Sequence, residues 1–205
     1  MASASVIDSR IKSSCFRATN VAKQRVQVKE CMSDSLNMAR NDDIRRIADA
    51  LKIDMKQLIF RGCRTSIFSA KQDDDSGKYL VTYSTDATPS EMLAVMAHEL
   101  AHVRQMMSPE TLVPSTSKQM ELGADFVAGL LYGRLFPDRS LMEFQNNLQL
   151  LARYNEVDEE AHGTPSQRTS AFRMGVFRNM DEHDSDYGQA LAFFYHDLYA
   201  PLVRI

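Results

Sequence analysis

The sequence predicts a mostly helical α+β domain in which a small antiparallel sheet packs on a helical bundle. The chain has 205 residues, of which 44% are apolar and 25% are charged, and this composition is typical of a protein with one sizeable core. Residues 58–70 and 78–84 have the pattern of two strands, whereas the periodicity after residue 85 is helical. Helices are therefore expected to be in the majority.

Charge and hydropathy argue against nucleic-acid binding and against a membrane-spanning helix. The net charge of −3 argues against bulk electrostatic binding to nucleic acid. No uncharged apolar stretch reaches the roughly 18 residues that a transmembrane helix needs. We therefore expect no nucleic-acid partner and no transmembrane segment, and the oligomeric state stays open.

The first forty residues differ in composition from the rest. Residues 1–29 contain six lysines and arginines, one aspartate and a cluster of serines, without the apolar core of a secretory signal peptide. We predict an N-terminal extension over 1–40, either helical or a targeting leader, followed by one domain over 41–205. The expected location is cytoplasmic, or exported without a secretory signal peptide.

The three cysteines are Cys15, Cys31 and Cys63, and none of them forms a C-x-x-C pair. Three widely spaced cysteines favour neither a disulfide framework nor a thiolate zinc site. We therefore expect unpaired cysteines and a reducing compartment.

Helix and turn signals place the elements in order. Asn41 can cap a helix whose apolar face follows, and residues 73–77 have turn chemistry between the two strands. Residues 79–84 are expected at a sheet edge, either as an ordinary strand or as one that pairs with an extended substrate. Thr88-Pro89-Ser90-Glu91 predicts a capped helix to Met107.

Four further helices are predicted, over 117–136, 140–155, from Thr164-Pro165 onward, and over 185–199. Gly129 and Gly133 lie one turn apart on the helix over 117–136. We expect another element to pack close to the backbone there.

The predicted helix that begins after Thr88 contains an H-E-x-x-H motif, from His98 to His102. Residues four apart lie on one helix face, with Cβ atoms about 5–6 Å apart, so that both imidazoles can bind one metal ion. Glu99 projects about 100° away from His98 and is placed to accept a proton from water as a general base. The alternative is a pair of helix histidines with ordinary hydrogen bonds.

A catalytic zinc site needs a third protein ligand. An extended motif would need a glycine at position 105 and a histidine at position 108, where the chain has Gln105 and Ser108. No histidine occurs between His102 and His162, which leaves carboxylates. Glu121 lies nineteen residues after His102 and would return to the motif if the two helices form a hairpin.

Asp125 follows Glu121 by one helical turn. A carboxylate at that position can accept the free ring N–H of a ligand histidine and fix its tautomer. The alternative is a solvated acidic face, against which the apolar neighbours argue: Leu122, Gly123, Ala124, Phe126 and Val127.

These motifs resemble the gluzincin metallopeptidases, and among them the bacterial neutral zinc metallopeptidases. Three blocks in the order of that family carry the resemblance: Ala97–Gln105, Glu121–Gly129, and His162–Arg168 with Phe172 and Gly175 after it. The residues before about 80 have no clear counterpart. Ala101 departs from the glycine that the family often has, and the family's N-terminal membrane anchor is lacking.

The resemblance implies a zincin-like fold and a zinc-dependent peptidase. It implies His98, His102 and Glu121 as zinc ligands, with Glu99 as general base and Asp125 behind the ligands. For His162 and Arg168, which belong to the third block, two interpretations remain open. His162 either donates to a developing oxyanion or caps a turn, and Arg168 either binds a carboxylate or braces the helix hairpin.

The predicted function is therefore zinc-dependent hydrolysis of peptide bonds in a peptide or protein substrate. One alternative is a non-catalytic zinc-binding module that serves folding or partner contact. A second is an exported effector or toxin peptidase with a narrow protein target.

Overall fold

The computed structural model describes residues 31–34, 36–64, 68–107, 114–154, 162–178 and 186–204, with the backbone alone for 148–154. The predicted N-terminal extension therefore lies mostly outside the described residues. In the described part, a mixed sheet and a set of helices share one hydrophobic core. The expectation of a mostly helical α+β fold is confirmed.

The sheet contains β1 (Cys31–Ser33), β2 (Leu58–Cys63), β3 (Ser69–Gln72) and β4 (Tyr79–Ser84), in the spatial order β1-β2-β4-β3. The pair β2–β4 is parallel, whereas β1–β2 and β3–β4 are antiparallel. The expectation of an antiparallel sheet is therefore wrong. The sequence pattern predicts one strand over 58–70, but β2 ends at Cys63 and β3 begins at Ser69, and β4 lies between these two strands in the sheet.

Residues 79–84 were expected at a sheet edge, and this expectation is wrong, because β4 lies inside the sheet. It pairs with β2 on one side and with β3 on the other, and almost all of its residues are buried. The strand beside it, β3, forms an edge of the described sheet and contacts the helix that carries the H-E-x-x-H motif.

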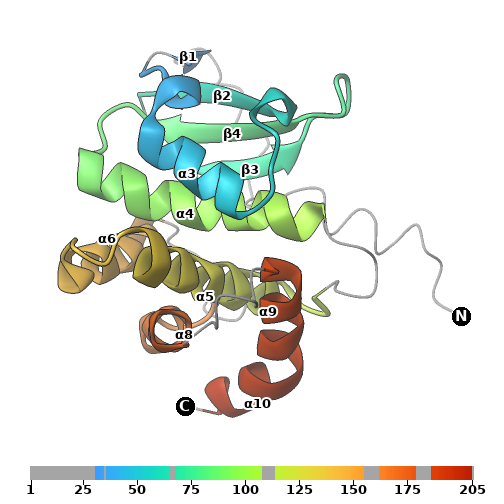
Figure 1. Cartoon of the computed structure of the whole chain (residues 1–205), viewed down its shortest axis with the longest axis vertical. Coiled ribbons are helices and arrows are strands. Elements are labelled where there is room, and N and C mark those ends of the chain that lie inside the picture. The colour runs from blue at the N-terminus through green and yellow to red at the C-terminus, as the bar shows by residue number, and fades with distance from the viewer. Residues whose placement is uncertain are drawn as a thin grey trace, which may run out of the picture.

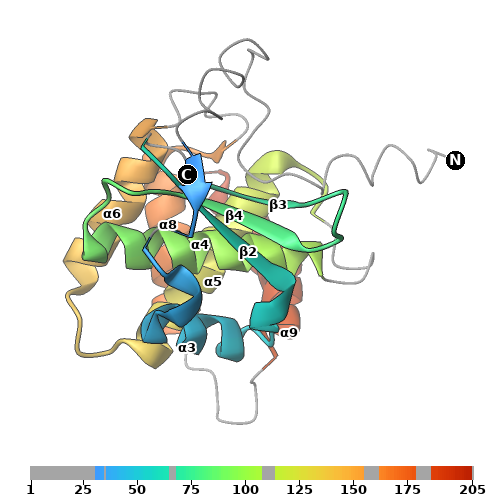
Figure 2. The same ribbon diagram turned by 90° about the horizontal axis from the view of Figure 1, so that it is seen from above.

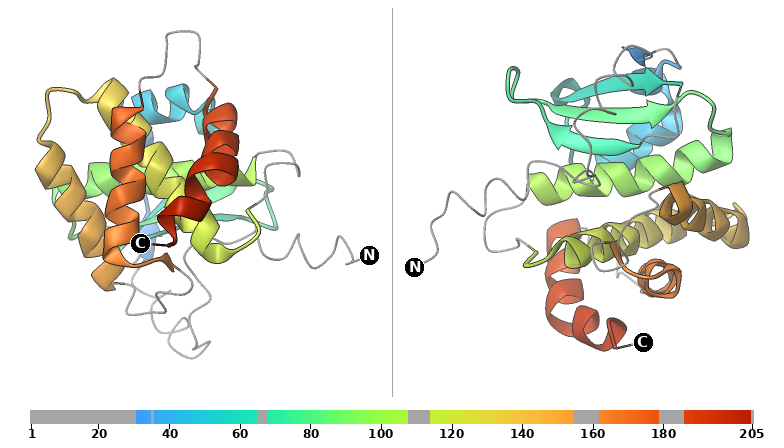
Figure 3. Two further views of the ribbon diagram at one scale, coloured as in Figure 1. Left: turned by 90° about the horizontal axis from the view of Figure 1, so that it is seen from below. Right: turned by 180° about the vertical axis from the view of Figure 1, so that it is seen from behind.

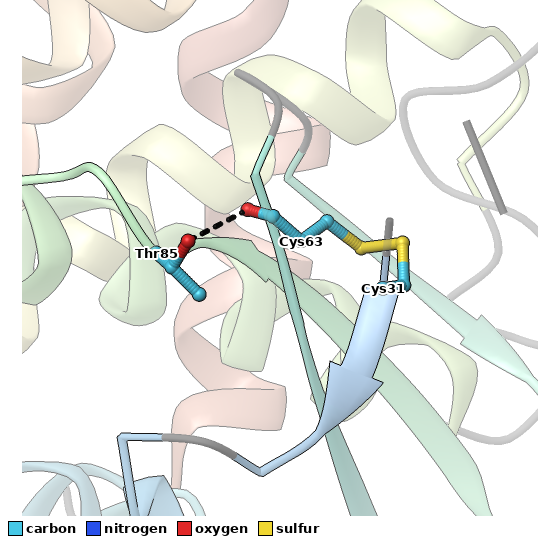
Figure 4. Close-up of a disulfide and its surroundings, with 3 residues drawn as sticks. All are labelled: Cys31, Cys63 and Thr85. Carbon is cyan, nitrogen blue, oxygen red and sulfur yellow. Dashed lines mark hydrogen bonds between the residues drawn. A yellow bond between two sulfur atoms is a disulfide. The ribbon is translucent and has the colours of Figure 1, made fainter. Parts of the chain in front are cut away.

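A disulfide joins Cys31 in β1 to Cys63 in β2, so the expectation of unpaired cysteines is wrong (Figure 4). The two residues are 32 apart in the sequence but directly opposite each other in the β1–β2 register. Thr85 donates from its backbone N–H and its hydroxyl to the carbonyl of Cys63. Strand pairing between distant segments creates this proximity, and cysteine spacing in the sequence does not report it.

Three elements lie between β1 and β2 in the chain. They are η2 (Met38–Arg40), α3 (Asp42–Ala50) and η3 (Met55–Gln57). Asn41 caps α3 as predicted, because its side chain accepts hydrogen bonds from two backbone N–H groups of the first turn. The predicted turn at 73–77 is also present, with the Asp73 side chain accepting from Ser76 and with Gly77 at a φ of 67°.

The helical part begins with α4 (Pro89–Met106) and α5 (Ser117–Leu135), followed by α6 (Leu141–Tyr154) and α8 (Pro165–Phe177). Helix α4 lies between the sheet and α5 (Figures 1 and 2). Both predicted Thr-Pro starts form capping boxes, at Thr88 for α4 and at Thr164 for α8. None of the helices in the described ranges has the length and apolar character needed to cross a membrane.

Helices α5 and α8 approach so closely that their backbones touch. A Cβ atom at Gly129 would lie 2.0 Å from the carbonyl oxygen of Phe172, and one at Gly175 would lie 2.0 Å from that of Phe126. The expectation of a close neighbour at Gly129 and Gly133 is confirmed, since Val176 also lies against Gly133. This packing sets α8, including Arg168, directly beside α5.

The chain ends in α9 (Tyr187–Phe193), the π-helical segment η5 (Phe194–Leu198) and α10 (Tyr199–Leu202). They replace the single helix predicted over 185–199. Pro201 has no N–H to donate to the preceding turn, and a π-helical turn is one way in which a helix accommodates such a break. Helix α8 and this C-terminal segment both lie on the side of α5 that faces away from the sheet (Figure 3).

Candidate metal centre

Helix α4 places His98 and His102 one turn apart on a fully buried face. Their Nε2 atoms are 3.0 Å apart, and the two rings meet edge to face. Both side chains are at most 2% exposed. Two ring nitrogens at this distance repel each other if both carry lone pairs, so a proton or a metal ion is required between them.

Glu121 from α5 completes a three-residue group, as the hairpin of α4 and α5 predicts. Its Oε2 atom lies 3.3 Å from His98 Nε2 and 3.5 Å from His102 Nε2. Zinc bonds of about 2.0–2.1 Å in tetrahedral geometry put neighbouring ligand atoms about 3.3–3.4 Å apart. The three separations are close to this value, and the triad could hold a metal ion.

The outer side of His98 rests on a buried ion pair. His98 Nδ1 lies 2.9 Å from Oδ1 of Asp125, and Arg168 from α8 donates to both oxygens of that carboxylate, at 2.7 and 2.9 Å. An ionised carboxylate only accepts hydrogen bonds, so Nδ1 carries a hydrogen, and in the neutral ring the lone pair is on Nε2, on the side of Glu121. Arg168 thus binds a carboxylate of the protein.

The outer side of His102 is held by a residue that the sequence analysis did not assign. His102 Nδ1 lies 2.7 Å from Oε1 of Gln105, and Nε2 of Gln105 donates to the Met120 carbonyl and to the Tyr195 hydroxyl. Gln105 lies three residues after His102 on the same face of α4, and this spacing could have identified it as a hydrogen-bond partner from the sequence. For Tyr195, ninety residues further on, the sequence offered no signal.

The charges of the group act strongly on one another. Burial disfavours a charged His98 ring, but the charge and hydrogen bond of Asp125 and the hydrogen bond of Glu121 together outweigh this effect and raise the pKa of His98 to about 9. Burial likewise opposes charge on Glu121, yet His102 and His98 hold its pKa well below the ordinary value. A proton on His98 and a metal ion are alternative ways to place positive charge at the centre of the triad.

Glu99 lies beside the triad and is 1% exposed. Burial raises the pKa of its carboxyl, while the charges of His98 and His102 act in the opposite direction. Its Oε2 atom is buried and accepts no hydrogen bond from any described residue. A buried carboxylate oxygen without a partner is costly, and it is the kind of atom that accepts a proton from a ligand or water.

His162 lies directly before Gly163 and the Thr164 cap of α8. Its Nδ1 atom is buried and has no hydrogen-bond partner within the described ranges. Gly163 has a φ of 83° and packs against the side chain of Leu122, next to Glu121 in the chain. The two roles considered for His162, oxyanion donor and turn cap, both stay predictions.

Comparison with known proteins returns no match among protein-family models, curated proteins or solved structures. The resemblance to the gluzincins therefore rests on the motif residues themselves. Two imidazole nitrogens and one carboxylate oxygen form a donor set that suits zinc. Together with the unpartnered oxygen of Glu99, this donor set fits a metal ion in the triad.

Proposed function

We propose that this protein is a zinc-dependent metallopeptidase. The observation that carries the proposal is the meeting of His98, His102 and Glu121 beside the buried carboxyl of Glu99. Structural zinc sites use four protein ligands, whereas catalytic sites use three and keep one position for water or substrate. The three-residue donor set, with a carboxylate base next to it, favours the catalytic class.

In the proposed reaction, each residue of the group has a separate task. His98, His102 and Glu121 would hold the zinc ion, which supplies Lewis acidity toward a peptide carbonyl and toward water. Glu99 would accept a proton from the attacking water and deliver it to the nitrogen of the leaving amine. The raised pKa of Glu99 favours this exchange, because a base works best when its pKa lies near the working pH.

Asp125 and Arg168 would act without touching the substrate. Asp125 holds His98 in the tautomer that binds metal, and Arg168 holds Asp125. Buried carboxylate–histidine contacts of this kind also raise the basicity of the ligand ring. Peptide bonds as the substrate follow from the resemblance of the motif blocks to the gluzincins.

Glu99→Gln tests the proposal, with zinc content and casein cleavage measured on the same preparations. We expect the variant to retain zinc and to lose about 10²–10⁴-fold in cleavage rate, since an amide cannot accept the proton. The matched control is Glu143→Gln, at an exposed position in α6.

The outcomes separate the alternatives. Full cleavage by Glu99→Gln would show that the proposed mechanism is wrong. Zinc bound by the wild type without cleavage of casein or of a broad peptide library would favour the non-catalytic module. Cleavage of one protein alone would favour a narrow-target peptidase.

A further inference from the structure

We infer that Tyr195, in the C-terminal segment η5, is a positioning residue for the metal centre and acts through Gln105 on His102. The inference rests on the metal-binding part of the proposed function. It adds a residue outside the three motif blocks and ties the end of the chain to zinc affinity.

The contacts of Gln105 fix which end of its amide faces His102. Its Nε2 atom lies 2.8 Å from the Met120 carbonyl oxygen and 2.9 Å from the Tyr195 hydroxyl. A backbone carbonyl can only accept hydrogen bonds, so the atom facing it must be the amide nitrogen. The carbonyl oxygen Oε1 then points at His102, 2.7 Å from Nδ1.

This orientation dictates the tautomer of His102. Because Oε1 of Gln105 only accepts, Nδ1 of His102 must carry the hydrogen, and Nε2 presents its lone pair to the triad. A flipped Gln105 would offer a donor to Nδ1 and favour the tautomer that cannot bind metal through Nε2. The Met120 carbonyl opposes that flip, because it can only accept, and the Tyr195 hydroxyl is the second partner that holds the Gln105 amide in place beside His102.

Tyr195 is placed for this contact by the packing of η5 on α5. A Cβ atom at Gly123 would lie 2.7 Å from the Tyr195 ring and 3.1 Å from Gln105 Nε2, so the absence of a side chain at 123 makes room for both. The neighbouring Phe194 is fully buried and stacks on Phe126 of α5, with ring centroids 4.9 Å apart. Docking of the C-terminal segment thus delivers the hydroxyl to Gln105.

Zinc affinity of the full-length protein, measured by competition with a chromophoric chelator, tests the inference. We expect Gln105→Met to weaken zinc binding by about 10–100-fold, the range for loss of a partner behind a ligand histidine. Tyr195→Phe removes one oxygen and should weaken binding by about tenfold, at the low end of that range. Tyr199→Phe is the matched control, because its hydroxyl lies 3.3 Å from the exposed hydroxyl of Thr116 rather than beside Gln105, and its loss should leave affinity unchanged.

A double variant shows whether Tyr195 acts through Gln105. If it does, Gln105→Met/Tyr195→Phe should bind zinc as weakly as Gln105→Met alone, because effects in one chain of contacts do not add. The visible absorption of the Co²⁺-loaded protein should shift in Tyr195→Phe and not in Tyr199→Phe, since it reports ligand geometry. Equal melting temperatures of the metal-free variants would show that the change is not a loss of folding.

Three results would contradict the inference. They are wild-type affinity in Tyr195→Phe, losses that multiply in the double variant, and an unchanged Co²⁺ spectrum. A wild-type protein that binds neither zinc nor Co²⁺ would instead overturn the proposed metal centre itself.

Discussion

The two histidines of the H-E-x-x-H motif lie on the same helix but are supported by different chemistry. Behind His98 stands a buried ion pair, Asp125 with Arg168, carried by the tightly packed helices α5 and α8. Behind His102 stands a neutral chain of hydrogen bonds, Gln105 with Tyr195, which depends on the C-terminal segment. The charged support should contribute to folding as well as to metal binding, whereas the neutral one should act mainly on metal binding.

The largest effect is expected from Asp125→Ala. Removal of the carboxylate leaves the buried guanidinium of Arg168 without the opposite charge of Asp125, which costs about 3–5 kcal/mol of the free energy of unfolding. Zinc affinity should fall by about 10–100-fold as well. Urea denaturation and chelator competition measure the two effects, with the exposed Asp138→Ala as control. Wild-type stability of Asp125→Ala would show that the ion pair is not a support of the fold.

A smaller effect is expected from Gly175→Ala, which tests the helix contact that brings Arg168 to Asp125. The new methyl group would lie 2.0 Å from a carbonyl oxygen of α5, so α8 must move away, at a cost of about 1–3 kcal/mol in unfolding free energy. The control is Gly133→Ala, whose nearest neighbour would be 3.1 Å away and which should stay within about 1 kcal/mol of wild type. Equal denaturation midpoints for both variants would contradict the close contact.

The smallest effect on stability is expected from Gly123→Ala, on the His102 side. The methyl group meets the outer edge of the Tyr195 ring, which can turn away, and alanine is the better helix former, so unfolding free energy should change by less than about 1 kcal/mol. Displacement of Tyr195 should nevertheless weaken zinc binding by about tenfold. If stability fell as far as in Asp125→Ala, the contrast between the two supports would be wrong.

Local signals explain what the sequence predicted well. The capping boxes at Thr88 and Thr164 involve residues three apart, and the spacing of His98 and His102 needs only a helix. Glu121 and Asp125 could be selected because the chain has few alternative ligands and because α4 and α5 follow one another in the chain, which favours a hairpin. In each case the interacting groups are close in sequence or joined by one turn of the chain.

The expectations that proved wrong concern groups far apart in the chain. The parallel pairing of β2 with β4 and the Cys31–Cys63 disulfide both depend on which strands become neighbours. An alternating pattern shows that a strand has a buried face, but it does not name the strand on either side. Composition likewise could not show that two of the three cysteines are directly opposite each other.

The sequence by itself determined most of the helices, their caps and the meeting of His98 with His102, because helix geometry turns spacing directly into distance, and elimination then left Glu121 as the third member of the triad. Only the tertiary structure decided what lies behind each imidazole, with Arg168 reaching Asp125 across the α5–α8 contact and Tyr195 reaching Gln105 from the C-terminal segment. The physical reason is that a hydrogen bond needs a partner within about 3 Å, and for distant segments only packing of the whole chain sets that distance.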